Sequence, residues 1–233
     1  METPAQALLI ERLLKRISPV VPGVKLAYKR HSKLMKLISK LLFFNKKFMT
    51  KYYTTLGSTI YIPDSHPATP LNLEVIAHEC KHIYDSRQHP ILYNLGYMFP
   101  QIMALFAFLA LGAIWSSLSW LWCLLFLIFL APIPSPGRML IERQGYLMSL
   151  ACEYWLNGRV NASSYTWIAK HFTGPNYYWM WPFSRRRIML WFVNQVGKII
   201  DEGDVPDRVF VVIRDFIRHE KLLKGNGGKN GKT

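Results

Sequence analysis

Much of the chain alternates apolar and polar residues with the period of an amphipathic helix. A first helix is predicted over residues 3–17, where Leu9, Leu13 and Ile17 share one face and prolines follow. A second helix is predicted over residues 25–44. Its apolar stripe is Leu34, Leu37, Ile38 and Leu41, and its basic stripe is Lys29, Lys33, Lys36 and Lys40. This second helix fits an anionic membrane surface or, equally, an ordinary solvated surface.

The helical period breaks over residues 51–62. These residues are rich in tyrosine, threonine and isoleucine, which favour strands, and Gly57 lies in their middle. We predict one strand with a bulge or a close backbone approach at Gly57. After a proline-containing turn the helical period returns, and a helix is predicted over residues 71–86.

Residues 93–133 contain no charged side chain. One crossing of a bilayer needs about 20 apolar residues, so this run is long enough for two. The two halves are predicted over 96–114 and 118–131, with a turn between Trp115 and Trp120 whose tryptophans suit a membrane interface. We predict a membrane hairpin. A shallow re-entrant hairpin and a buried core hairpin of a soluble protein are the alternatives.

The remaining segments are mostly helical. Helices are predicted over residues 138–156, 184–201 and 207–223, a helix with an irregular loop over 161–183, and a disordered tail over 224–233. The predicted fold class is mainly α (α+β). It comprises one domain, residues 1–223, with a small β element, and the two-helix hairpin 93–133 interrupts it.

Composition and charge indicate which class of partner the chain binds. The chain has 29 Lys and Arg against 14 Asp and Glu, a net charge of +15, which suits nucleic acid or an anionic membrane. Hydrophobic residues make up 51% and are concentrated in one block, so a lipid bilayer is the expected partner. No nucleic-acid motif accompanies the basic run Arg185-Arg186-Arg187, and no nucleic acid is expected.

The cysteines and the N-terminal residues indicate the cellular compartment in which the protein is expected. Three cysteines, an odd number, give no disulfide framework and favour a reducing compartment. The N-terminus lacks a basic segment followed by an apolar run, so no signal peptide is expected.

The helix predicted over 71–86 contains H-E-x-x-H, formed by His78, Glu79 and His82. A spacing of four places both imidazoles on one helix face, where they can hold one Zn²⁺. Glu79 lies beside them as a candidate base for a water molecule. The apolar residues before the motif and the strand upstream are what a zincin-like site needs.

A third zinc ligand is expected from the helix after the hairpin. Glu142 follows apolar Leu140 and Ile141, so its carboxylate is predicted to point inward, where it requires a partner. Zinc would be such a partner. Pairing with Arg138 or Arg143 is the alternative. Glu153 and Asp85 are the other candidate ligands.

The ligands also constrain the membrane topology. His78 and His82 precede the apolar run and Glu142 follows it, so they can meet only if the run returns to its own side. All Lys and Arg residues then lie on that side. The positive-inside rule predicts an integral membrane protein with both flanks and the active site in the cytoplasm.

This order of features resembles the membrane-embedded gluzincin zinc metallopeptidases of the HtpX and CAAX-prenyl-protease type. That family carries H-E-x-x-H, a membrane hairpin and then a helix with E-x-x-x-D. Here the motif and the hairpin are followed by Glu142 and, four residues on, Tyr146 in place of Asp. Asp85 stands where the family often has Asn. The resemblance spans about residues 52–156, and the family's additional N-terminal spans are not expected.

The resemblance implies a zinc-dependent metallopeptidase. Glu79 would act as the general base for peptide-bond hydrolysis. An oxyanion would need one donor besides the metal, for which Tyr146, His171 and Tyr178 are the candidates. A protein or peptide substrate would pair in extended form with the strand over 56–62.

A second function stays open in the sequence. The chain fits a non-catalytic integral membrane protein whose metal site is structural or vestigial and which binds lipid or a protein partner. Tyr146 and Asp85, at the two positions that depart from the family pattern, favour it. The oligomeric state is left open.

Overall fold

We analysed a computed structural model of the chain. The structure describes residues 4–41, 45–64, 72–131, 133–174, 184–203 and 205–227. It is mainly helical with one three-stranded sheet, which confirms the mainly α expectation. The chain divides into two compact units, the first formed by Met1–Arg87, Gly145–Val160 and Val196–Thr233 and the second by Gln88–Gln144 and Asn161–Gln195.

The sheet of the first unit has the order β1-β3-β2. Strand β1 (Lys25–Tyr28) runs parallel to β3 (Thr59–Ile62), and β2 (Thr54–Leu56) runs antiparallel to β3. The prediction of one helix over 25–44 is therefore wrong for residues 25–32, since the helix itself begins only at Lys33. Pairing with β3, far along the chain, outweighs the local helical period there.

The predicted single strand over 51–62 is also wrong in one respect. It is a hairpin, because Leu56 pairs with Thr59 across the two residues between them. Gly57 has φ +58°, which glycine adopts without strain, and it makes the turn rather than a bulge.

Four helices enclose the core of the first unit. Helix α1 (Pro4–Ile17) packs along α8 (Arg208–Gly227), and Arg12 pairs with Glu220 at 3.1 Å. The other two are α3 (Leu73–Gln88) and α5 (Pro136–Asn157). The core side chains are fully buried and include Leu13, Ile17, Ile60, Ile62, Ile76, Ile83, Leu147, Ala151, Phe210 and Ile213. The predicted tail begins too early, because α8 continues to Gly227, and residues 228–233 lie outside the described part.

Helix α2 (Lys33–Leu41) follows the short 3-10 turn η1 (Lys29–His31). The hydroxyl of Ser32 accepts a hydrogen bond from the Met35 backbone N–H and caps the helix. Lys29 does not join the predicted basic stripe, because its side chain is fully buried. Its ammonium donates to the Phe48 carbonyl at 2.6 Å.

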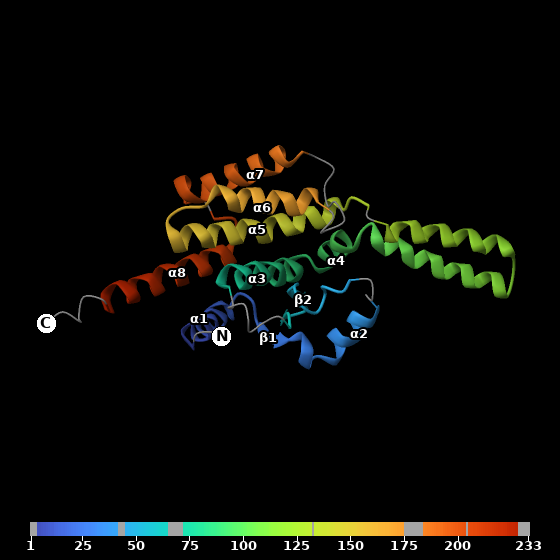
Figure 1. Ribbon diagram of the computed structural model, residues 1–233, viewed down its shortest axis with the longest axis horizontal. Helices are drawn as coiled ribbons and strands as arrows, with labels where there is room; N and C mark the ends of the chain where they lie inside the picture. Colours follow the sequence, from blue (N-terminus) through green and yellow to red (C-terminus); the bar gives the residue numbers. More distant parts are fainter. Residues whose placement is uncertain are drawn as a thin grey trace. The chain divides into compact units, whose positions relative to one another are not determined.

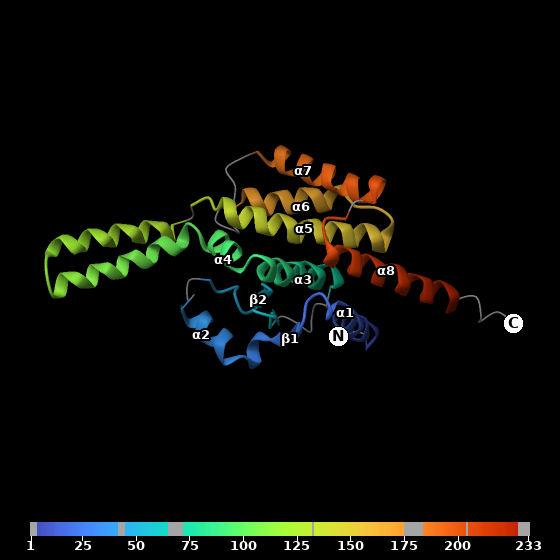
Figure 2. The ribbon, with the colours of Figure 1, turned by 180° about the vertical axis from the view of Figure 1, so that it is seen from behind.

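The hairpin belongs to the second unit. Helix α4 (Pro90–Met98) leads into the 3-10 helices η2 (Gln101–Ile114) and η3 (Leu118–Leu130), which lie side by side (Figure 1, Figure 2). The expected first leg over 96–114 is thus broken near Pro100. Each leg winds with three residues per turn, not 3.6.

This period of three sorts the hairpin's side chains into ridges. Ala104, Ala107 and Ala110 form a buried small-residue ridge on η2. On η3, Cys123, Phe126 and Phe129 recur at the same interval and are half-buried, and the Phe106 and Phe126 ring centroids lie 5.3 Å apart. The other ridges are exposed, and their large apolar members include Leu105, Phe108, Leu109, Leu111, Ile114, Leu121, Trp122, Leu124, Leu125, Leu127, Ile128 and Leu130.

Within the described residues, no single helix has both the length and the apolar character to cross a membrane. Helices α4 and η2 pass that test of length and composition together, with a bend of 79° between them.

Two more helices complete the second unit. They are α6 (Ala162–Thr173) and α7 (Arg185–Gly197), of which α7 continues into the π-helical turn η5 (Lys198–Glu202) in the first unit. Phe172 of α6 and Phe192 of α7 are fully buried, with their ring centroids 5.8 Å apart.

Candidate metal centre

Helix α3 presents the two histidines of the H-E-x-x-H motif on one face. His78 and His82 are 8% and 6% exposed, and their rings meet edge to face with centroids 4.6 Å apart. The two Nε2 atoms are separated by 2.9 Å. The predicted helix and the predicted convergence of the imidazoles are both present.

Helix α5 approaches α3 closely at His78. A Cβ at Gly145 would lie 2.6 Å from Nε2 of His78, closer than real contacts allow, so this position requires glycine. Tyr146 follows and packs its ring against the same imidazole, with centroids 4.8 Å apart. Ser149, one turn later, places Oγ 3.4 Å from Nδ1 of His78. Three residues of α5, at positions 145, 146 and 149, thus surround the ring of His78.

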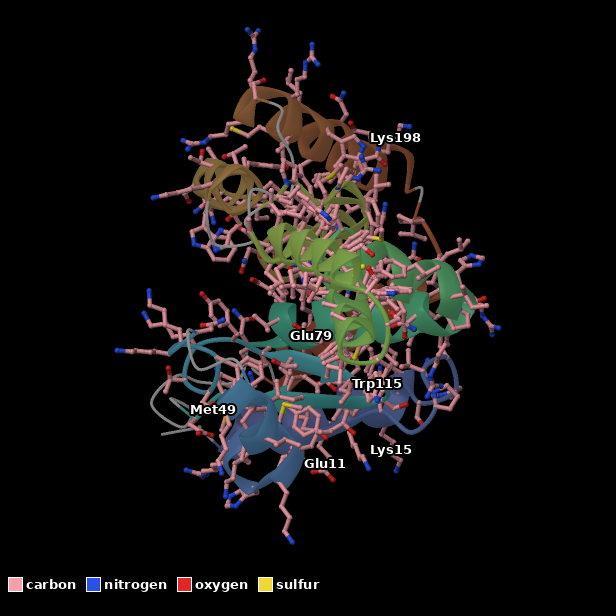
Figure 3. The ribbon with its side chains drawn as sticks, turned by 90° about the vertical axis from the view of Figure 1, so that its right-hand side faces the viewer. Glu11, Lys15, Met49, Glu79, Trp115 and Lys198 are labelled. Carbon is pink, nitrogen blue, oxygen red and sulfur yellow. The ribbon has the colours of Figure 1, made fainter. Side chains whose placement is uncertain are left out.

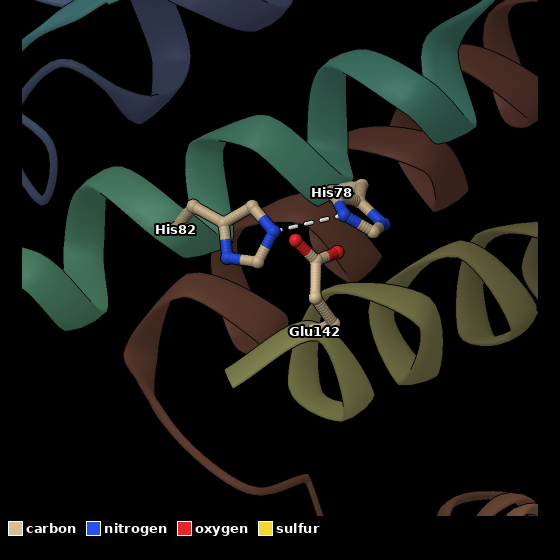
Figure 4. A group of neighbouring side chains, drawn as sticks. All are labelled: His78, His82 and Glu142. Atoms are coloured by element: carbon tan, nitrogen blue, oxygen red, sulfur yellow. Dashed lines mark hydrogen bonds between the residues drawn. The ribbon is translucent and has the colours of Figure 1, made fainter. Parts of the chain in front are cut away.

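Glu142 lies one turn before Tyr146 on the same helix and completes the cluster. Its carboxylate is buried, at 4% exposed, as predicted. One ligand atom from each of His78, His82 and Glu142 lies within 4.8 Å of the other two (Figure 4). These three side chains form a group that could hold a metal ion.

The spacing of the donor atoms fits a tetrahedral ion. Ligand atoms about 2.0–2.2 Å from a tetrahedral zinc lie roughly 3.3–3.6 Å from one another. The Nε2 atoms of His78 and His82 are slightly closer than this, and the largest separation in the cluster, 4.8 Å, is slightly greater. Small side-chain rotations bring such a set into register, and two imidazoles with one carboxylate are donors that zinc accepts.

Arg138 and Arg143, the alternative partners proposed for Glu142, each contact an aromatic ring. The guanidinium of Arg138 lies over the Tyr97 ring at 4.7 Å and donates from Nε to the Tyr97 carbonyl at 3.1 Å. The guanidinium of Arg143 lies over the Trp191 ring at 3.9 Å. Both arginines thus contact aromatic neighbours.

Helix α4 supplies a partner for Glu142. The Tyr97 hydroxyl donates a hydrogen bond to Oε1 of Glu142 at 3.1 Å. This contact depends on two glycines, since a Cβ at Gly137 would lie 2.7 Å from the Gly96 Cα. Because α4 and the start of α5 touch at these backbones, Tyr97 reaches the carboxylate.

Glu79, labelled in Figure 3, faces the sheet. The hydroxyl of Thr55, on the edge strand β2, donates to Oε2 of Glu79 at 2.5 Å. This bond orients a carboxylate that follows His78 directly in the sequence. Cys80 comes next and is fully buried, and burial raises the pKa of its thiol well above the usual range, so it stays protonated and unreactive.

Asp85 and Glu153, the alternative ligands, are not in this cluster. Asp85 accepts a hydrogen bond from the ammonium of buried Lys81, which also pairs with Asp207 at 3.0 Å. Burial raises the pKa of Asp85, and Lys81 opposes that effect. Glu153 follows Glu142 by 11 residues on α5, about 16 Å along the axis, too far to share its ion.

The three candidate oxyanion donors have different surroundings. Tyr146 is buried against His78, beside the proposed ligands. His171, on α6, stacks on Trp167 with centroids 4.0 Å apart, and its Nδ1 lies 2.8 Å from the Trp167 carbonyl oxygen. Tyr178 lies outside the described residues. The donor role stays a prediction for all three.

Three contributors were not predicted from the sequence: Thr55, Tyr97 and Gly145. A lone glycine inside a helix, three residues after a proposed ligand, is a signal of close helix approach that identifies Gly145. The pair Gly96 and Gly137 is a similar signal for α4 and α5. Tyr97 and Thr55 carry no local signal, because each contacts a residue more than 20 positions away.

No family model, curated protein or solved structure matches the chain. The geometry of the site is therefore the basis for the function.

Proposed function

We propose that the protein is a membrane-anchored zinc metallopeptidase that hydrolyses peptide bonds. The observation that carries this proposal is the buried cluster of His78, His82 and Glu142, with Glu79 beside it on α3. Two histidines one helical turn apart with a carboxylate from a second helix form a donor set used by catalytic zinc sites.

Each residue of the site would have a separate role in hydrolysis. His78, His82 and Glu142 would hold the zinc, which when bound acidifies a water molecule and polarises the substrate carbonyl. Glu79 accepts the proton of the attacking water and delivers it to the leaving amine. Thr55 keeps the Glu79 carboxylate in one orientation through its 2.5 Å hydrogen bond. Glu79 gives up the proton that it accepted and ends the reaction as a carboxylate.

The exposed apolar ridges of η2 and η3 support membrane anchoring. A contiguous apolar surface of this extent is unfavourable in water and marks a membrane or protein contact. The uncharged stretch 93–133 separates His82 from Glu142, so both ends of the hairpin would lie on the side of the bilayer that holds the site. Under the positive-inside rule, that side is the cytoplasm.

The decisive test is Glu79→Gln in purified full-length protein. We expect about one zinc per chain in both proteins by metal analysis, and a loss of peptide hydrolysis of at least about a hundredfold in the variant. The matched control is Glu74→Gln, one turn earlier on α3. Glu74 is not among the proposed ligands and has no role in the proposed mechanism, so activity should persist in this variant. Full activity in Glu79→Gln would remove Glu79 from the mechanism.

One observation favours a second function, a non-catalytic membrane protein with a structural metal. All three proposed ligands are less than 9% exposed, and structural zinc sites are closed whereas catalytic sites keep an open position. Stoichiometric zinc, a lower melting temperature after chelation and no hydrolysis of any peptide in a diverse library would establish this function instead.

A further inference from the structure

Helix α2 turns Leu34 and Leu37 toward solvent. Leu34 and Leu37 are 43% and 55% exposed, whereas the buried contact of the helix with its own unit is made by Met35. An ordinary amphipathic surface helix does the reverse and buries its leucine-rich side. The apolar side of α2 is therefore available to something other than the core.

The exposed leucines are flanked by positive charge. Lys33, Lys36 and Lys40 are exposed on the same helix. Between Glu11 and Asp64 the sequence has 12 Lys and Arg residues and no Asp or Glu. The segment that contains α2 thus carries a large excess of basic groups, although Asp64 accepts a hydrogen bond from the Arg30 backbone N–H just before the helix, and any partner should be anionic.

We propose that α2 lies in the headgroup layer of an anionic bilayer. Leu34 and Leu37 would insert among the upper acyl chains while Lys33, Lys36 and Lys40 bind anionic headgroups. Exposed leucines beside lysines are the composition of interfacial helices, and nucleic acid offers the leucines no apolar contact. This second membrane contact does not depend on the proposed peptidase activity or on the hairpin.

The test measures the depth of α2 in vesicles. Full-length Cys123→Ser protein, whose other two cysteines are buried, receives Leu37→Cys and an environment-sensitive fluorophore. It is reconstituted in vesicles of phosphatidylcholine, with or without phosphatidylglycerol, containing a lipid with a nitroxide high on its acyl chain. We expect severalfold stronger quenching with phosphatidylglycerol, and weakening of that quenching as salt is raised.

Two controls separate α2 from general effects. The triple variant Lys33→Glu, Lys36→Glu, Lys40→Glu should lose the quenching. Charge reversal of Arg185, Arg186 and Arg187, exposed on the other unit, changes the net charge equally and should keep it. A fluorophore on Glu11→Cys of α1 should stay unquenched.

Each other outcome is informative. An unquenched Leu37 label beside a quenched native Cys123 label would overturn the proposal for α2 and leave the hairpin anchor intact. An unquenched Leu37 label with tight, salt-sensitive RNA binding that the lysine variant abolishes would replace lipid with nucleic acid as the partner. Loss of hydrolysis in Glu79→Gln, or its persistence, has no bearing on either result.

Discussion

The Tyr97 hydroxyl fixes one of the two oxygens that Glu142 can present to a metal. Its own ring is held by Arg138, which contacts both the ring and the backbone carbonyl, and by a parallel stack on Tyr93 with centroids 6.1 Å apart. Hydrogen bonds that orient metal ligands affect affinity although they do not touch the ion. Tyr97 is therefore a positioning residue.

Tyr97→Phe should weaken zinc binding by about tenfold or more, because the carboxylate of Glu142 loses its orienting donor. Zinc affinity is measured by competition with a chromophoric chelator. Tyr93→Phe is the matched control, since it removes a hydroxyl from the stacked neighbour and should leave the affinity unchanged. Equal affinities in all three proteins would show that Tyr97 does not position the ligand.

Much of the candidate site could be predicted from individual residues. The spacing of His78 and His82 fixes their shared face, and the apolar neighbours of Glu142 indicate its burial. The orienting groups escape prediction for a physical reason. Tyr97 and Glu142 are 45 positions apart, and their contact depends on how two helices pack, which no local period encodes.

At the scale of elements, the site is a seam between α3 and α5. Helices pack with their axes about 8–10 Å apart, and small residues permit the closest approach. At Gly145 the missing side chain leaves room for the His78 imidazole. The proposed ligand His78 keeps its position between α3 and α5 only if no side chain occupies the space at Gly145.

Gly145→Ala should displace the His78 ring and lower zinc affinity by at least about tenfold. The added methyl group would lie within 3 Å of three imidazole atoms, and overpacking of this kind also costs about 1–3 kcal/mol of stability. Zinc titration and thermal unfolding measure the two effects.

Gly197→Ala is the control for this substitution. A Cβ at Gly197 would meet only a carboxylate oxygen of Asp201 at 3.9 Å, so alanine should be neutral or slightly stabilising. If Gly145→Ala binds zinc as tightly as Gly197→Ala does, the close approach is not what holds His78.

The elements themselves differ in how well they are predicted. Long amphipathic segments such as α1, α3 and α8 follow the sequence period because burying one face stabilises them. Strand β1 does not, because its stability comes from pairing with β3, about 34 positions later. The 3-10 winding of the hairpin also escapes prediction, because an all-apolar run shows no polar face from which a period could be measured.

At the scale of the whole molecule, stability depends on a lysine in the core. Lys29 is fully buried, its ammonium lies 3.7 Å from the Phe48 ring centroid, and burial lowers the pKa of Lys29 from 10.5 to about 8. Below pH 8 the amine is charged in both the folded and the unfolded chain, so the burial penalty is constant. Between pH 8 and 10.5 only the unfolded chain keeps the proton, so the free energy of unfolding rises with pH.

Deprotonation of Lys29 should raise the free energy of unfolding by on the order of 2 kcal/mol between pH 8 and 10.5. Urea unfolding of the wild-type protein and of Lys29→Met at several pH values measures it. The free energy of unfolding of the wild-type protein should rise relative to that of the variant as pH rises, because only the wild type has the titrating amine. Parallel curves would mean that Lys29 titrates at its ordinary pKa in the folded protein.

The alanine ridge of the hairpin makes the packing of its two legs sensitive to the number of residues inserted into η2. With three residues per turn, each residue inserted between Ala104 and Ala107 rotates Ala104 by about 120° relative to the rest of the ridge. One or two inserted alanines should turn Ala104 away from η3, and a third should restore it. Cross-linking between cysteines on the two legs would show this recurrence. An α-helical hairpin would instead recover nearest to a fourth inserted residue, so an insertion series measures the winding of the legs genetically.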